Sequence, residues 1–144
     1  MKANNERGMT LVEILASLVI LSLLIVSFLT FFPIVAKQNN ISNEIMDATY
    51  IAQATMENII DIKNDSRVYP TTVTNIKNLG FTLDSPTKKT YIKDQLYNNI
   101  NYIILVDLKE PNNQMSHVIV KVFELSNTKK QRAQMETILW WENN

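Results

Sequence analysis

The sequence predicts an α+β protein in which a long N-terminal helix packs on a small antiparallel β-sheet. An uncharged apolar run extends from Ile14 to Ala36, and apolar residues then recur at helical spacing from Ile41 to Ile59. Three later segments alternate apolar and polar residues, which is typical of strands. A length of 144 residues suits one folded domain with an appendage. We therefore expect an apolar helix followed by a single folded domain.

Composition excludes several classes of function. The formal net charge is zero, so no global positive charge favours nucleic-acid binding. The absence of cysteine excludes disulfides and thiolate metal sites, and a single histidine, His117, cannot form a histidine-rich site. The only glycines, Gly8 and Gly80, cannot form a glycine-rich phosphate loop. No residue pattern is typical of catalysis, so we expect a protein that is not an enzyme and uses no cofactor.

The apolar run has the length of a membrane span. Its 23 uncharged residues exceed the roughly 20 that a helix needs to cross a bilayer core. A cleavable secretory signal has a shorter apolar core, of about 7–15 residues. Lys2 and Arg7 precede the run, which places the N-terminus in the cytoplasm. The sequence predicts a single-pass membrane protein whose C-terminal part lies outside the cell membrane.

Glu13 places a carboxylate at the start of this apolar segment. An acidic residue costs roughly 2.5–3.5 kcal/mol at the centre of a membrane helix, and less near its end. The side chain could extend to the lipid headgroups. Alternatively, cleavage after Gly8 would give Met9 an α-amino group that could pair with Glu13, within one chain or between neighbours. Such a pair would offset most of the cost of burying either charge.

The stretch "RGMTLVEILASLVILSLL" resembles the processing motif of type IV prepilins and pseudopilins. The resemblance implies that Gly8 ends a leader peptide, and that prepilin peptidase cuts after it. Met9 would then be the methylated terminus, although phenylalanine is commonest there in the family. Glu13 would be the family glutamate, which guides assembly. The expected product is a structural subunit of a filament.

The same resemblance implies a pilin-like division of the chain. Residues 1–8 would be the leader, 9–36 the transmembrane and assembly helix, 37–66 its amphipathic continuation, and 67–144 the exported domain. The expected partners are prepilin peptidase, other pilin or pseudopilin subunits, the membrane, and indirectly the assembly platform with its ATPase. We expect the protein in the cell membrane first and in a cell-surface filament afterwards.

The helix should continue well beyond the apolar run. Its pattern predicts helix from Met9 to Lys63, and Pro33 should bend it because proline removes one backbone hydrogen bond. In an alternative interpretation the helix ends at Phe32 and restarts after Asn39-Asn40. The continuation has one apolar stripe with spacings of three and four residues, formed by Ile41, Ile45, Ala48, Ala52, Thr55 and Ile59.

Three segments predict an antiparallel meander: Ile100 to Glu110, His117 to Leu125 and Glu136 to Glu142. Polar, turn-rich stretches join them. Alternation places one residue set of each strand on the same face, namely Tyr102, Ile104, Val106 and Leu108, then Val118, Val120 and Val122, then Thr137, Leu139 and Trp141.

The intervening segment, residues 67–99, has a mixed pattern. Short strands are expected at Phe81 to Leu83 and at Thr90 to Ile92. The second face of the sheet also carries apolar residues, such as Ile103 and Phe123. We therefore expect this segment to cover part of that second face.

Two C-terminal features suggest possible binding surfaces. Lys129, Lys130 and Arg132 could contact DNA phosphates. A solvated hairpin loop is the commoner reason for such a run, so DNA contact is a minor alternative. Trp140-Trp141 could form a binding surface, but on a strand one ring should face the core.

Two classes of function remain. The first is a subunit, of minor type, of a type IV pilus, a type II secretion pseudopilus or a DNA-uptake (competence) pseudopilus. The alternative is a single-pass anchored extracellular binding protein that does not polymerise. Cleavage after Gly8 separates the two.

Overall fold

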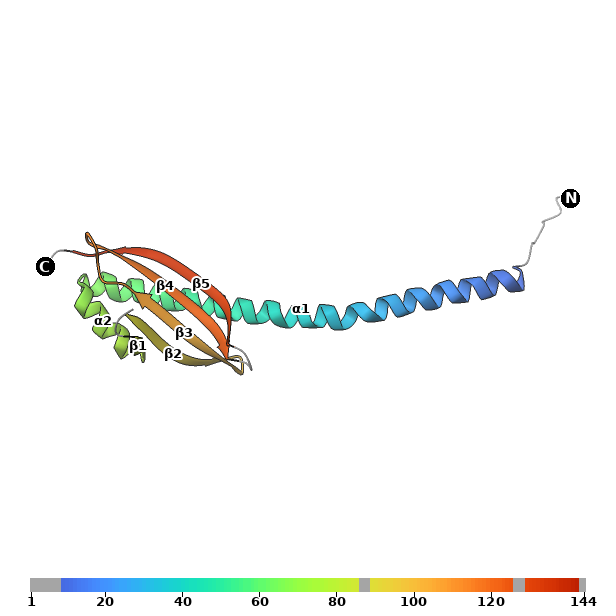
Figure 1. Ribbon diagram of the computed structural model, residues 1–144, viewed down its shortest axis with the longest axis horizontal. Coiled ribbons are helices and arrows are strands. Elements are labelled where there is room, and N and C mark those ends of the chain that lie inside the picture. Colours follow the sequence, from blue (N-terminus) through green and yellow to red (C-terminus); the bar gives the residue numbers. More distant parts are fainter. Residues whose placement is uncertain (1–8, 86–88, 126–128, 143–144) are drawn as a thin grey trace. The chain divides into compact units, whose positions relative to one another are not determined.

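A computed structural model describes residues 9–85, 89–125 and 129–142, and its fold is α+β (Figure 1). Within these residues two helices precede five strands in a single sheet, with the strand order β1-β2-β3-β4-β5 and antiparallel pairing throughout. The elements are α1 (Leu11–Ser66), α2 (Tyr69–Asn78), β1 (Thr82–Ser85), β2 (Thr90–Tyr97), β3 (Ile100–Leu108), β4 (Met115–Leu125) and β5 (Lys129–Trp140). Internal contacts divide the chain into two units, Met1–Ile41 and Ser42–Asn144.

The first unit contains the apolar part of α1. Every residue from Met9 to Asn40 is exposed, including the whole apolar run. Among the described residues, α1 is the one helix whose length and composition would allow it to cross a membrane. The helix continues through Pro33, so the alternative in which it ends at Phe32 is wrong. The bend expected at Pro33 stays a prediction.

Hydroxyl groups in this apolar helix bond to its own backbone. Each donates to a carbonyl oxygen three or four residues earlier, at 2.7–2.8 Å. No hydroxyl of this set therefore needs water, which suits a helix in lipid. The set comprises Ser17, Ser22, Ser27 and Thr30.

The second unit contains the rest of α1, which packs on the sheet. The predicted stripe is confirmed from Ala48 onward, whereas Ile45 remains 43% exposed. Ala48 and Ala52 are fully buried, and their small side chains allow the helix backbone to approach the strands closely. The buried residues of the helix are Ala48, Ile51, Ala52, Thr55, Met56 and Ile59.

The central strands follow the predicted alternation. In β3 and β4 every second residue faces α1 and is buried. These residues are Tyr102, Ile104, Val106 and Leu108 in β3, and Val118, Val120 and Val122 in β4. Leu139 and Trp141 are buried whereas Ile138 and Trp140 are exposed, which confirms that one tryptophan of the pair faces the core. β5 begins at Lys129, earlier than the sequence pattern indicated.

Asparagine forms the tight turn between β2 and β3. Asn98 and Asn99 have φ angles of 47° and 62°, as a two-residue type I′ hairpin requires. The side-chain amide nitrogen of Asn98, Nδ2, also donates to both carboxylate oxygens of Asp47 at 3.1 Å. The same residue therefore closes the hairpin and attaches it to α1.

The short strands expected in the segment after α1 are present as β1 and β2, and residues 69–78, for which no element was predicted, form the helix α2. Pro70 lies in the first turn of this helix, where no backbone donor is needed. Thr72 and Ile76, four residues apart, are buried. Ile76 joins the core that α1 forms with the sheet. Among the described residues this segment therefore packs on the α1 side and forms no element that covers the second face, contrary to the expectation, and half-buried side chains such as Ile103 and Phe123 occupy that face.

Candidate functional site

Thr10 and Glu13 form a reciprocal set of hydrogen bonds at the start of α1. The backbone nitrogen of Thr10 donates to Glu13 Oε2 at 2.7 Å, and the Thr10 hydroxyl donates to the same oxygen at 3.0 Å. The backbone nitrogen of Glu13 donates to Thr10 Oγ1 at 3.3 Å. This arrangement is a capping box, which satisfies orphan donors at a helix start. It explains why α1 begins at Leu11.

The capping box changes the interpretation of Glu13. Its carboxylate already has two donors from its own chain, both on Oε2. Sequence reasoning considered only headgroups or a new amino terminus as partners and missed Thr10. The signal was present, since a threonine followed three residues later by a glutamate before an apolar run predicts this cap.

The capping box does not include the other predicted site residues. Gly8 lies outside the described residues. Met9 precedes the helix and is 76% exposed. Pro33 lies inside α1, twenty residues after Glu13, and is not part of the same cluster. The structure therefore brings Glu13 together with Thr10, beside Met9 in the chain.

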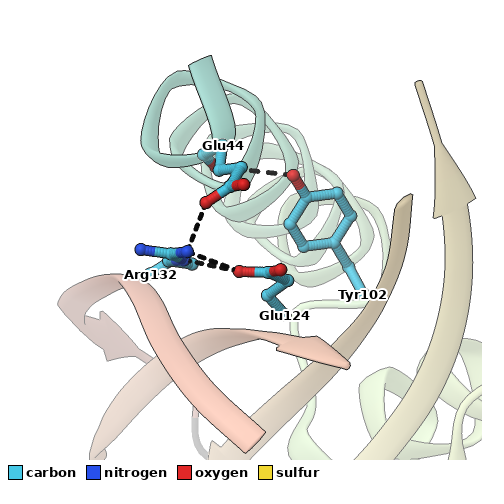
Figure 2. A network of polar contacts seen from close by, with 4 residues as sticks. All are labelled: Glu44, Tyr102, Glu124 and Arg132. Carbon is cyan, nitrogen blue, oxygen red and sulfur yellow. Dashed lines mark hydrogen bonds and ion pairs between the residues drawn. The ribbon is translucent and has the colours of Figure 1, made fainter. Parts of the chain in front are cut away.

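A second polar cluster lies between α1 and the sheet in the second unit (Figure 2). β4 and β5 lose register where Val122 pairs with Ala133 and Phe123 with Gln131. Arg132 is the extra residue of this β-bulge, and such bulges redirect a side chain. Arg132 points to α1, where it pairs with Glu44, and its Nε donates to Glu124 Oε2 at 2.7 Å. Its side chain is only 8% exposed.

This cluster corrects the expectation of a solvated basic loop. Arg132 belongs to β5 and is buried by two carboxylates, so it is not available to DNA phosphates. Only Lys129 and Lys130 of the predicted run are exposed. The cluster links α1, β4 and β5, and its role is to hold the helix on the sheet.

Tyr102 completes the cluster from β3 (Figure 2). Its hydroxyl donates to the backbone oxygen of Glu44 at 3.5 Å. Burial raises the pKa of Tyr102 to about 12, and the negative charges of Asp47, Glu124 and Glu44 add to this effect. The tyrosine therefore stays neutral at physiological pH, as a buried hydroxyl should.

At the other end of the sheet, an open cavity of about 520 Å³ lies beside α2. Tyr69 lines it and donates to the Leu108 backbone oxygen at 3.2 Å. Lys89 and Glu110 form an ion pair of 3.3 Å along its wall. Within the described residues, no group of three histidine, cysteine, aspartate or glutamate side chains could hold a metal ion.

Comparison with known families identifies the N-terminal segment. Residues 3–29 match a family model described as the prokaryotic N-terminal methylation motif. This motif is the hallmark of type IV pilin and pseudopilin precursors, so the resemblance noted in the sequence is confirmed. It includes Gly8, Met9, Thr10 and Glu13. Comparisons with curated proteins and with solved structures gave no match.

Proposed function

We propose that this chain is a filament subunit, of minor type, in a type IV pilus or pseudopilus. It is made as a membrane-anchored precursor, cleaved after Gly8 by prepilin peptidase and methylated at Met9. One observation supports this proposal above all. The methylation motif at residues 3–29 overlaps the start of a helix, Leu11–Ser66, that contains an apolar stretch long enough to cross a membrane.

The exposed helix is physically suited to leave a membrane for a filament. Its apolar side chains can exchange lipid for equally apolar neighbouring helices, so the transfer costs little. The serine and threonine hydroxyls of the run already bond to their own helix and need no new partner. A bundle of such helices would form the filament core.

Glu13 can serve both the capping box and a charge pair. The donors of Thr10 both reach Oε2, and no described residue donates to Oε1. An ammonium group at a cleaved Met9, in the same chain or in a neighbour, could bind to Oε1 without breaking the cap. Partial burial in a helix bundle would strengthen this pair, since water screens it less there. We infer that Glu13 sets the register of neighbouring subunits in this way.

The wider cellular setting follows from this role. The subunit would wait in the cell membrane, with its N-terminus in the cytoplasm and its domain outside. The assembly platform and its ATPase would then extract it together with other pilin or pseudopilin subunits. DNA uptake, type II secretion and type IV pili all use filaments of this kind.

Cleavage is tested by co-expression with a prepilin peptidase. We expect the intact mass to fall by the mass of eight residues, with the gain of a methyl group where the enzyme also methylates. Gly8→Phe should abolish the mass change, because a bulky side chain blocks the peptidase, whereas Ala3→Phe in the same leader should not. A wild-type chain that keeps all its residues would overturn the proposal.

Assembly is tested with two variants of Glu13. Glu13→Gln keeps a capping side chain without the charge, and Glu13→Ala removes both. We expect both variants to be cleaved and neither to enter filaments efficiently. Normal incorporation of Glu13→Gln would disprove the charge pair. A wild-type chain that is cleaved but remains monomeric would favour the anchored binding protein, for which the cavity beside α2 offers a site.

A further inference from the structure

The outward surface of α1 in the second unit changes in character along the helix. Met46 and Tyr50 are 67% and 60% exposed. Glu57 and Asp61 follow on the same face, because the spacings of four, seven and four residues match helical turns. We call these four residues the helix patch. It begins apolar and becomes acidic, and it faces away from the buried stripe of Ala48 and Ile59.

The adjoining ends of β4 and β5 carry the opposite combination. Leu125 is 51% exposed and pairs in register with Lys129 on the outer face of the sheet, whereas the exposed Lys130 pairs with Glu124 and lies on the opposite face of the strand end. The Lys129 ammonium lies 4.9 Å from the centre of the Phe123 ring, so an apolar and a basic surface adjoin. We call Leu125, Lys129 and Lys130 the hairpin patch.

The acidic half of the helix patch lies too far away to meet the hairpin patch of its own chain. Lys130 pairs in register with Glu124, whose carboxylate binds Arg132, and Arg132 in turn pairs with Glu44. Asp61 lies seventeen residues beyond Glu44 on α1, which corresponds to about 26 Å along the helix. Any contact between these charges must therefore join two different molecules.

We propose that a second copy of this chain docks its hairpin patch on the helix patch, with Lys129 and Lys130 against Glu57 and Asp61. The helix patch joins exposed apolar area to two acidic side chains, and the end of the hairpin joins Leu125 to two lysines, one on each face of the strands, so that the charges of the two patches are opposite. The two surfaces differ, so the contact is heterologous, and heterologous contacts repeat into rings or open helical filaments. This inference rests on the proposed filament and names the surfaces through which its domains meet.

The two halves of the contact have different roles. Burial of Met46, Tyr50 and Leu125 removes apolar area from water and favours association. The exposed charges add little affinity, but they fix orientation and exclude wrong registers. Because exposed charges are screened by ions, the interface should weaken as salt is added.

Charge reversal tests the pairing in cells that assemble the filament. Lys129→Glu with Lys130→Glu should lower incorporation at least tenfold, and Glu57→Lys with Asp61→Lys should do the same. The four changes together should restore incorporation, because the charges are exchanged. Lys77→Glu with Lys109→Glu is the matched control. Both lysines are exposed outside the two patches, and the net charge changes by the same amount as in the Lys129 and Lys130 variant. Cleavage by prepilin peptidase, measured in every variant, shows that each precursor reaches the membrane.

The outcomes separate this inference from the proposed function. A wild-type chain that never enters a filament disproves the filament role itself. Wild-type incorporation combined with equal incorporation of both reversed pairs disproves only the docking. If both reversed pairs fail and the fourfold variant is not restored, the assigned pairing is also wrong.

A disulfide provides a direct distance test, because the chain contains no cysteine. Asp61→Cys together with Lys130→Cys should give a ladder of linked subunits in oxidised filaments. Each single substitution alone should give none. A doubly substituted chain that enters filaments without any linked dimer would contradict the contact, since a disulfide requires Cα atoms within about 7 Å.

Discussion

Arg132 shows how one residue depends on backbone geometry. Strict alternation along β5 would point its side chain away from α1, and the β-bulge turns it inward to Glu44 and Glu124. One guanidinium serves two carboxylates, so its removal would leave two like charges close together with little access to water. The position is therefore sensitive although it lies near the end of a strand.

We expect Arg132→Met to lower the free energy of unfolding by about 3–5 kcal/mol, as for other broken buried ion pairs. Urea denaturation followed by circular dichroism measures the loss. Lys130→Met is the matched control, because that neighbouring side chain is exposed, and it should change stability by less than about 0.5 kcal/mol. Adding Glu44→Gln and Glu124→Gln to Arg132→Met should recover part of the loss. A loss below about 1 kcal/mol in Arg132→Met would contradict this role.

Tyr102 should limit stability at alkaline pH. Its pKa is near 10 in the unfolded chain and about 12 in the folded protein. The folded state therefore holds a proton that the unfolded state loses above pH 10. The resulting stabilisation is complete below pH 10 and is lost as pH rises through 12, by an amount on the order of 2 kcal/mol.

Chemical denaturation between pH 8 and pH 11.5 tests this expectation. Tyr102→Phe should show a smaller decline in stability over the alkaline range than the wild type. Part of the decline should remain, because burial also raises the pKa of Tyr69 to about 12. Tyr50→Phe, at an exposed position, should follow the wild-type curve. Parallel curves for Tyr102→Phe and wild type would count against the assignment.

At the scale of elements, the contact of α1 with the sheet depends on small side chains. Ala52 has no exposed area and allows the helix to lie close to the strands. Ala54 is half-buried beside a cavity of about 140 Å³ between the helix and β2. The two alanines therefore differ in the space available for a larger side chain.

We expect Ala52→Leu to destabilise the protein by about 1–3 kcal/mol through overpacking. Ala54→Leu, the same change two residues later, should be close to neutral because the cavity can accept the added atoms. Thermal denaturation of the two variants provides the comparison. Equal destabilisation by both changes would show that the spacing of α1 from the sheet is not set by Ala52.

The β2–β3 hairpin is a second element whose local chemistry can be tested. Asn99 has a φ of 62°, a conformation that costs most L-residues roughly 1–2 kcal/mol. Asn99→Ala should therefore destabilise by about 1 kcal/mol, and Asn99→Gly should match or exceed wild-type stability. Urea midpoints of the three proteins decide the matter, and a wild-type midpoint for Asn99→Ala would exclude strain at this turn.

At the scale of the whole molecule, the two units have different solvents. Among the described residues, the buried core lies entirely within residues 48–141, whereas those up to Asn40 are all exposed. The second unit therefore needs water on its surface, and the first needs lipid or neighbouring helices. Neither environment suits both parts at once.

We expect a fragment of residues 42–144 to fold without the first unit, because it retains all the core residues that the structure describes. It should remain monomeric in water and unfold in one cooperative thermal transition. The full chain in detergent should show a transition at a similar temperature. A fragment that lacks a cooperative transition would mean that the first unit contributes to folding.

The sequence alone determined the apolar helix, the methylation motif and the alternating faces of β3, β4 and the end of β5. These features arise from periodic patterns of neighbouring residues, and local geometry converts such patterns directly into structure. Only the tertiary structure decided that residues 69–78 form a helix, that the second sheet face stays without a covering element among the described residues, and that Arg132 turns inward. Each of these depends on contacts between residues far apart in the chain, or on one extra residue in a strand, and such contacts leave no periodic signal in the sequence.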